Sequence, residues 1–168
     1  MLIRTATLDD LPAIAALEKI IEDPRVAASF EVLSGRLRLF PEGFFAAISE
    51  QRVVGYLESI RWDGPAFEKF ADIKQYERMH LPLGSVLYIA FLAVDPEYRK
   101  HGIASRLMQA AESMAAALSL QSIQLVALPK LVDFYGKMGF RQVRTLPQFL
   151  ESSAGELMQK DLNAQQPA

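Results

Sequence analysis

The pattern of apolar and polar positions predicts alternating helices and strands along the whole chain. Apolar residues recur at helical spacing over residues 11–21 and again over 103–118, as expected for helices that bury one face. Residues 86–94, VLYIAFLAV, are almost continuously apolar, which is typical of a strand covered on both faces. The helix over 103–118 and a further strand at 121–128 follow this strand. The three elements together predict a right-handed parallel βαβ unit.

The first third of the chain predicts one strand and two helices. A strand over residues 2–7 leads into the first helix through a capping box, because Asp10 follows Thr7 at a spacing of three. Asp23-Pro24 is expected to end that helix, since the residue before a proline disfavours the helical region. A second helix is predicted over 27–40. It places Phe30, Leu33, Leu37 and Phe40 on one side and Arg36 and Arg38 elsewhere.

The rest of the chain predicts strands, one short helix and a long excursion. Two strands over 43–61 with a polar turn at 49–52 form a hairpin. Residues 62–84 are predicted to form a long loop with one or two helical turns, called the excursion below. Loops of this length are usually functional. Past 128 we expect a short helix from Pro129 to a stop at Gly139, then two more strands.

This element order defines an α/β fold. It contains six or seven strands in a mixed, mostly antiparallel sheet, with about four helices around it. We expect a single domain over residues 1–162 and a frayed tail over 163–168.

Composition narrows the class of protein. Of 168 residues 51% are hydrophobic, and the net charge is -2, which argues against a nucleic-acid partner. The chain has no cysteine, and its two histidines, His80 and His101, lie far apart, so no metal site is expected. The first residues do not resemble a signal peptide, and no apolar run is long enough for a bilayer. We therefore expect a cytoplasmic protein without a membrane partner.

The segment VDPEYRKHGIASRLM, residues 94–108, is the strongest candidate for chemistry. Arg99, Lys100 and His101 precede Gly102 and the start of a helix, where free backbone N–H groups and the helix dipole attract anions. Gly102 lets the backbone approach a ligand closely, and the small Ala104 keeps the next turn clear. A turn with solvated charges is the alternative interpretation. The segment is neither a Walker loop nor a dinucleotide fingerprint.

LAVDPEYRKHGIASRLM and the later VDFYGKMGF together resemble the Gcn5-related N-acetyltransferases, the GNAT family. In that family an R/Q-x-x-G-x-G/A loop holds the pyrophosphate of acetyl-coenzyme A (acetyl-CoA), and an F-Y-x-x-x-G-F segment supplies a tyrosine near the thioester sulfur. The resemblance extends from about residue 2 to 162. It implies a GNAT-like single-domain fold with acetyl-CoA as co-substrate and no metal.

The resemblance assigns acetyl-CoA contacts to two regions. The backbone at residues 92–94 would pair with the pantetheine arm like an added strand, and the N–H groups around 99–104 would hold the pyrophosphate. Ala104 stands where many members have glycine, which leaves the phosphate site intact. The implied cofactor-binding residues are Leu92, Ala93, Val94, Arg99, Lys100, His101, Gly102, Ile103, Ala104, Ser105, Phe134, Tyr135 and Lys137.

The implied reaction is direct attack of a primary amine on the acetyl thioester. An alkylamine with a pKa of about 10.4 must lose a proton first, and backbone N–H groups at 91–93 would stabilise the oxyanion. Tyr135 would protonate the leaving thiolate, although a tyrosine that merely packs is the alternative.

The proton acceptor is less certain than the donor. FPEGFF and FLAV resemble the arylalkylamine N-acetyltransferase branch, which carries two histidines where this chain has Tyr88 and Ala90. Tyr88 would instead steer a water, or Glu31 or Glu58 would act as a carboxylate base. A buried Tyr88 with a satisfied hydroxyl is the alternative.

The acceptor amine is the least determined part. Aromatic residues of the excursion would wall an aromatic or aliphatic pocket, while its acidic residues would attract an ammonium group; ordinary core packing of a helix is an equal alternative. The candidate substrate residues are Phe30, Glu31, Trp62, Tyr76, Tyr88 and Phe91. We favour acetylation of a primary amine that is small, aromatic or aliphatic. Acetylation of a peptide or protein N terminus and acetyl-CoA binding without turnover are the alternatives. The resemblance also raises the option of a homodimer.

Overall fold

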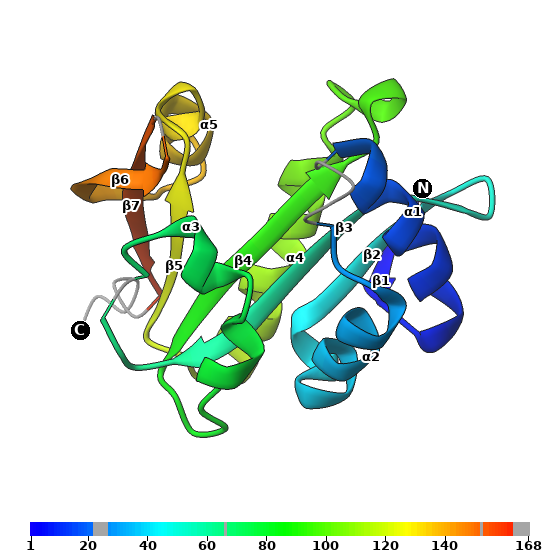
Figure 1. The fold of residues 1–168 in the computed structure, drawn as a ribbon, viewed down its shortest axis with the longest axis horizontal. Helices are drawn as coiled ribbons and strands as arrows, with labels where there is room; N and C mark the ends of the chain where they lie inside the picture. The colour runs from blue at the N-terminus through cyan, green and yellow to red at the C-terminus, as the bar shows by residue number, and fades with distance from the viewer. Residues whose placement is uncertain (22–26, 66, 152, 163–168) are drawn as a thin grey trace. The chain divides into compact units, whose positions relative to one another are not determined.

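A computed structural model describes residues 1–21, 27–65, 67–151 and 153–162. It contains a seven-stranded sheet in the order β1-β2-β3-β4-β5-β7-β6 (Figure 1). The pairs β1–β2, β2–β3, β5–β7 and β6–β7 are antiparallel, whereas β4–β5 is parallel. The predicted mixed, mostly antiparallel sheet and its βαβ unit are therefore confirmed. The strands are β1 Leu2–Thr5, β2 Phe44–Ser49, β3 Arg52–Trp62, β4 Val86–Val94, β5 Ser122–Ala127, β6 Arg141–Leu150 and β7 Ser153–Asp161.

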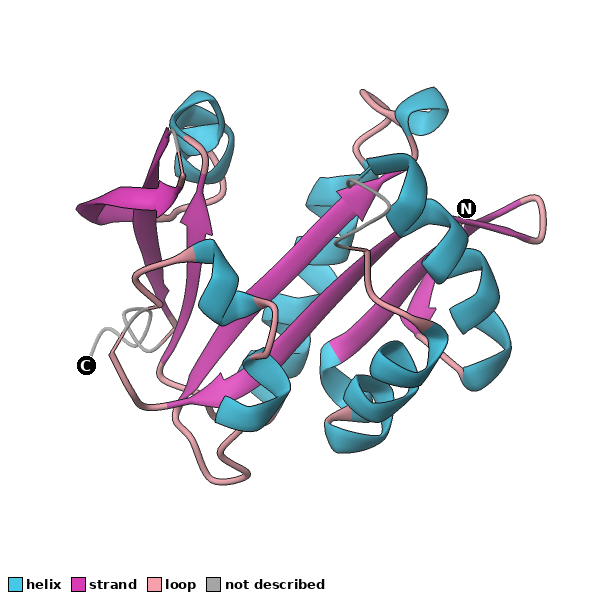
Figure 2. Ribbon diagram, viewed as in Figure 1, coloured by secondary structure: helices cyan, strands magenta, loops and turns pink. Residues whose placement is uncertain are grey.

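Helices of very different lengths connect these strands (Figure 2). The described residues form five α-helices, one more than expected, because the excursion contributes a short one. The α-helices are α1 Leu11–Ile21, α2 Phe30–Leu39, α3 Phe70–Ile73, α4 Ile103–Ala117 and α5 Val132–Gly136. Single 3-10 turns are η1 Leu8–Asp10, η2 Pro41–Gly43, η3 Tyr76–Met79, η4 Pro96–Tyr98 and η5 Pro129–Leu131. Among the described residues, no helix combines the length and the apolar character that a membrane crossing requires.

Internal contacts divide the chain into two compact units. The first unit comprises Met1–Ser59 and Phe91–Met114, and the second comprises Ile60–Ala90 and Ala115–Ala168. Strands β3 and β4 and helix α4 contribute residues to both. The predicted domain limits, 1–162, stay a prediction, and the predicted frayed tail lies outside the described residues.

In the first unit, helices cover both faces of β2 and β3. Leu11, Ile14 and Leu33 from α1 and α2 pack in one cluster with Phe44 and Tyr56 of the strands. The opposite face carries α4. A Cβ at Gly55 would lie 3.4 Å from side-chain atoms of both Ile103 and Leu107, an ordinary contact distance. It would also lie 2.9 Å from the Ala93 carbonyl oxygen of β4, so glycine here permits the close approach of that backbone.

The capping box before α1 is confirmed. The Asp10 carboxylate accepts hydrogen bonds from the backbone N–H and the hydroxyl of Thr7, at 2.8 and 3.0 Å. The Asp10 N–H donates back to the Thr7 carbonyl at 3.1 Å. Arg4 of β1 also donates to the Asp10 carboxylate, at 2.6 and 2.9 Å. Strand, turn and helix are thus joined at one carboxylate, while the predicted stop at Asp23-Pro24 lies outside the described residues.

Helix α2 begins three residues later than predicted, and two of its residues are not where the periodicity placed them. Ser29 is the N-cap, because its hydroxyl accepts a hydrogen bond from the Val32 N–H at 3.3 Å. Phe30, expected on the buried side, is 45% exposed in the first turn. Arg36, expected away from the buried side, is only 4% exposed, because it forms an ion pair with Glu58 of β3.

The predicted hairpin is confirmed. Strands β2 and β3 pair from Phe44↔Glu58 to Ser49↔Arg52. The two turn residues, Glu50 and Gln51, have φ angles of 49° and 66°, as a two-residue turn with matching twist requires.

The second unit contains the excursion and the last three strands. The excursion folds as α3 and η3, close to the predicted one or two helical turns. Phe67 of the excursion contacts two other rings. Its ring centroid lies 5.7 Å from that of Trp62 and 4.8 Å from that of Tyr88. Leu118, predicted on the apolar stripe of α4, lies past the helix end and is 38% exposed. The strand that the sequence predicts over residues 140–146 is longer in the structure, because β6 continues to Leu150.

Candidate active site

The segment after β4 forms an ordered loop in the first unit. Its turn begins at Asp95, whose carboxylate accepts the Glu97 N–H at 2.9 Å. The Arg99 Nε donates to the Val94 carbonyl at 3.3 Å. His101 places Nδ1 3.1 Å from the Tyr98 carbonyl, and because that oxygen can only accept, Nδ1 carries the hydrogen. The remaining polar groups of both side chains face solvent.

Gly102 occupies the point where this loop becomes α4. Its φ angle is +71°, a conformation that favours glycine, and a Cβ built there would meet no atom within 4 Å. The Arg106 N–H donates to the Gly102 carbonyl at 3.1 Å, which starts the helix. The N–H groups of residues 103–105 therefore precede the first intrahelical hydrogen bond. Open space beside free N–H groups fits a phosphate.

The loop residues predicted from the sequence are exposed, half-buried or buried. Arg99, Lys100 and His101 are exposed, and Ala104 and Ser105 are half-buried in the first helical turn. Ile103 is buried, so its side chain anchors α4 and only its backbone can face a ligand. Leu92, Ala93 and Val94 are half-buried at the end of β4 in the same unit. The first unit therefore contains both the residues predicted to contact pantetheine and those predicted to contact pyrophosphate.

Tyr135 lies in α5 of the second unit, within a group of aromatic rings. Its ring centroid is 5.0 Å from that of Phe134 and 5.9 Å from that of Phe140. Burial raises the pKa of the Tyr135 phenol to about 12, because the charged form is poorly solvated there. The phenol is therefore a proton donor at neutral pH. Phe134 is half-buried and Lys137 is exposed.

Tyr88 lies on β4 in the second unit and is fully buried. Among the described residues, its hydroxyl has no hydrogen-bond partner. Burial raises the pKa of this phenol well above its ordinary value. The packing alternative therefore has no protein partner for this hydroxyl among the described residues. An unsatisfied buried hydroxyl is costly and requires an explanation.

The two carboxylates considered as bases have contrasting surroundings. Glu58 is fully buried, and its Oε2 accepts a hydrogen bond from Arg36 at 3.2 Å. Glu31 is exposed at the start of α2, and hydrogen bonds from its own backbone N–H and from Ser29 hold its pKa below the usual value. The paired Glu58 and the solvated Glu31 are both weaker candidates for a base than an isolated buried carboxylate.

Glu18 is a buried polar residue that the sequence analysis did not single out. It is 3% exposed in α1, and its carboxylate accepts hydrogen bonds from the Tyr56 hydroxyl, at 3.1 Å, and from the Ala28 N–H. A signal was present, because Glu18 falls four residues after Ile14 on the buried side of the helix. Glu18 thereby holds the residues that lead into α2 against β3.

The candidate substrate residues do not form one open group. Phe30 and Glu31 are exposed and Phe91 is half-buried, all three in the first unit. Trp62 and Tyr76 are buried in the second unit, and the Trp62 Nε1 donates to the Pro65 carbonyl at 3.1 Å. Their role in substrate binding stays a prediction, but their burial favours the core-packing alternative.

Polar residues of the excursion also have structural partners. The His80 Nδ1 accepts the Arg61 N–H at 3.2 Å. Asp63 accepts the Ser85 N–H at 2.6 Å, and Glu68 forms an ion pair with Arg144. These contacts connect the excursion to β3, β4 and β6 within the second unit.

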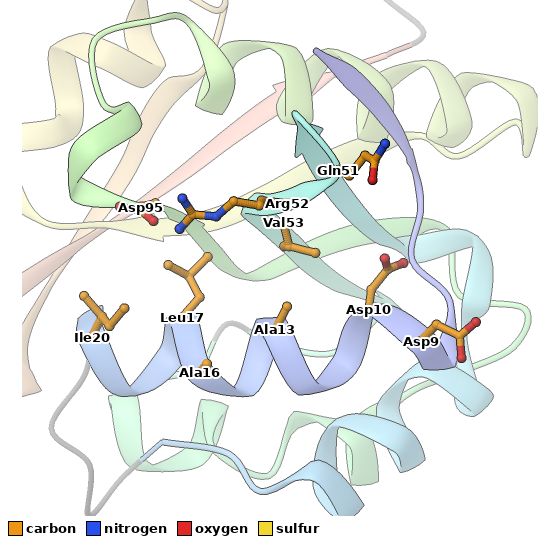
Figure 3. Close-up of a pocket in the computed structure, with 10 residues that line it drawn as sticks. All are labelled: Asp9, Asp10, Ala13, Ala16, Leu17, Ile20, Gln51, Arg52, Val53 and Asp95. Carbon is orange, nitrogen blue, oxygen red and sulfur yellow. The ribbon is translucent and has the colours of Figure 1, made fainter.

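A separate pocket of about 350 Å³ lies in the first unit between α1 and the β2–β3 hairpin (Figure 3). Side chains of α1 and the hairpin face each other across it, and the Arg52 guanidinium extends toward Asp95. The lining contains none of the candidate site residues. It consists of Asp9, Asp10, Ala13, Ala16, Leu17, Ile20, Gln51, Arg52, Val53 and Asp95.

Comparisons with known proteins identify the family. The model of the Acetyltransferase (GNAT) family matches residues 9–140. The chain is 30% identical over 149 residues to an N-alpha-acetyltransferase of Saccharolobus solfataricus, covering 86% of this chain and 82% of that relative.

Two solved structures share the fold. The loading GNATL domain of CurA from Lyngbya majuscula has a TM-score of 0.82 at 20% identity, covering 96% of this chain and 97% of that one. The GphF GNAT-like decarboxylase in complex with isobutyryl-CoA has a TM-score of 0.79 at 24% identity, covering 97% and 100%. At these identities the likeness is one of fold.

The match to the family model over residues 9–140 defines the class of protein as a coenzyme A-dependent acyltransferase. The chain belongs to the acetyltransferase (GNAT) family. It is accordingly an acyl-CoA N-acyltransferase that uses acetyl-CoA as co-substrate and an amine as acceptor.

Proposed function

We propose that the protein transfers the acetyl group of acetyl-CoA to the α-amino group of a peptide or protein N terminus. The observation that carries this choice is the 30% identity to an enzyme named N-alpha-acetyltransferase, over 82% of that enzyme's length. This acceptor was an alternative in the sequence analysis, where a small aromatic or aliphatic amine was preferred.

The packing of the excursion is the structural reason for changing that preference. An aromatic amine needs ring surfaces that it can reach. Phe67 instead stacks on Trp62 and meets Tyr88 edge-on, and the three residues are at most 8% exposed. A small aliphatic amine remains the second candidate, because the exposed Glu31 carboxylate can attract a lone ammonium group.

The loop of the first unit accounts for binding of the co-substrate. Free N–H groups at residues 103–105 and the open space at Gly102 would accept the pyrophosphate, and Arg99 and Lys100 would add charge-assisted contacts. The backbone of Leu92 to Val94, which is half-buried at the end of β4, would align the pantetheine arm. Acetyl-CoA supplies the acetyl group already activated as a thioester.

The two buried tyrosines would handle the protons. In the transfer a C–N bond forms, the C–S bond breaks, the amine loses a proton and the leaving sulfur gains one. Tyr135 is suited to give a proton, because burial keeps its phenol neutral. The Tyr88 hydroxyl, buried and unpartnered among the described residues, is suited to hold a water that takes the proton from the amine.

The test is a thiol-release assay on three classes of acceptor. These are peptides with a free N terminus, the same peptides with a blocked N terminus but a free lysine, and small aliphatic and aromatic amines. We expect release of coenzyme A with the first class, and mass spectrometry should place 42 Da, about the mass of one acetyl group, on the N terminus. Turnover with small amines alone would overturn the choice of acceptor.

A further inference from the structure

The guanidinium of Arg36 joins three elements of the first unit. It lies 3.2 Å from the Glu58 carboxylate on β3 and 5.5 Å from the centroid of the Phe91 ring on β4. Arg36 itself belongs to α2. Both side chains of the ion pair are almost fully excluded from solvent, with 2% and 0% exposure.

Stability alone is a weak reason for such an arrangement. Removing two charges from water costs about as much as their attraction returns, and packed apolar residues often replace a buried pair without loss. A guanidinium has a feature that apolar residues and lysine lack: a rigid plane that stacks on an aromatic ring while its edge binds a carboxylate. The arrangement therefore fixes geometry in two directions at once.

The contact between Arg36 and Phe91 lies beside residues that are proposed to bind acetyl-CoA and the acceptor amine. Phe91 directly precedes Leu92 to Val94 on β4, the backbone proposed to align the thioester. Helix α2 begins with Phe30 and Glu31, which are exposed and are candidates for binding the acceptor amine. A shift of α2 against β4 would therefore move the acceptor relative to the acetyl group.

We infer that Arg36 is a positioning residue for acetyl transfer that acts through Phe91. Glu58 holds the Arg36 guanidinium over the Phe91 ring. This inference rests on the proposed function, because it takes α2 and β4 as the acceptor and thioester sides. Arg36 touches neither substrate. Its contribution is to keep the distance and orientation of the reacting groups, to which rates are very sensitive.

The first test is Arg36→Lys, which keeps the charge beside Glu58 but removes the plane over Phe91. We expect kcat to fall about 10-fold, whereas KM for acetyl-CoA stays unchanged, because the loop at Gly102 is untouched. The matched control is Arg38→Lys, an exposed arginine of the same helix, which should leave kcat unchanged. An unaltered kcat in Arg36→Lys would overturn the inference.

A double-mutant cycle with Phe91→Leu tests whether Arg36 acts through the ring. If it does, Arg36→Lys should change kcat less than twofold once Phe91 is leucine, because the partner of the stack is gone. Additive losses would show that Arg36 acts by another route.

The last variant separates positioning from folding. Arg36→Met combined with Glu58→Leu removes both charges and should still fold, as judged by circular dichroism and the thermal midpoint. We expect a folded protein whose kcat is reduced as in Arg36→Lys. Wild-type kcat in this variant, or in Arg36→Lys if the double variant fails to fold, would show a purely structural role.

Failure of the inference and of the proposed function give different results. Wild-type protein that acetylates only small amines overturns the peptide acceptor, and the same variants are then compared with the best amine. Wild-type protein that acetylates peptides while Arg36→Lys is equally active overturns the inference alone.

Discussion

The ring of Tyr88 meets Phe67 edge-on, with 4.8 Å between centroids, and its hydroxyl is buried without a partner among the described residues. The ring contributes to packing, but the hydroxyl does not. An unsatisfied buried polar group requires an explanation, and the proposed role in proton transfer supplies one.

Tyr88→Phe should therefore separate stability from activity. Because no hydrogen bond within the described residues is lost, the free energy of unfolding should stay the same or rise by about 1 kcal/mol. Turnover should fall if the hydroxyl holds a water that takes part in proton transfer. Urea unfolding and steady-state kinetics measure the two effects.

Tyr56→Phe is the matched control for that experiment. Tyr56 is also buried, but its hydroxyl donates to Glu18 at 3.1 Å. Its removal takes a donor from a buried carboxylate and should lower the free energy of unfolding by about 1–3 kcal/mol. Equal destabilisation by Tyr88→Phe would mean that its hydroxyl has a bonded partner after all.

Tyr135→Phe should lower turnover strongly and leave acetyl-CoA binding nearly intact. The phenol is the proposed proton donor to the leaving sulfur, and the loop that would bind the pyrophosphate does not depend on its hydroxyl. Steady-state kinetics and calorimetric titration with acetyl-CoA measure the two quantities. Unchanged kcat would remove Tyr135 from the mechanism.

The same tyrosine predicts a pH dependence of stability. Its pKa is about 12 in the folded protein and about 10 when unfolded, so above pH 10 the folded state retains a proton that the unfolded state loses. Stability is therefore complete below pH 10 and falls as the pH rises toward 12. Tyr135→Phe should make alkaline unfolding less steep in this range, as followed by circular dichroism.

Gly102→Val should abolish acetyl-CoA binding. The φ angle of +71° is strained for any side chain, and a valine would fill the open space beside the helix N–H groups. Gly35→Ala is the control, because a Cβ there also meets nothing within 4 Å but lies on α2. Calorimetry should show binding only for the control, and wild-type affinity in Gly102→Val would refute the loop assignment.

Local features of the sequence predicted most of the fold and the loop. The capping box at Thr7, the hairpin turn and the loop at Gly102 depend on neighbouring residues, so spacing alone identifies them. The apolar run of β4 likewise predicted that Tyr88 is buried.

Features that depend on distant partners could not be predicted in this way. Periodicity treats Arg36 as solvent-exposed, because its partner Glu58 lies 22 residues away. Glu18 is buried for the same kind of reason, since Tyr56 and Ala28 supply its donors. Phe30 shows the converse: its apolar side chain matched the buried stripe, but the helix begins there and leaves it exposed.

Asp10→Asn should destabilise the protein near neutral pH and lose its effect in acid. Hydrogen bonds from Arg4, together with those from Thr7, hold the Asp10 pKa below its ordinary value, so the folded state favours the ionised carboxylate. The resulting stability is present above pH 3.8, the ordinary value, and is lost as the pH falls through the lowered value. Urea unfolding at several pH values should therefore show wild type and Asp10→Asn converging in acid. A difference between wild type and Asp10→Asn that stays constant with pH would place the loss outside the ionised carboxylate.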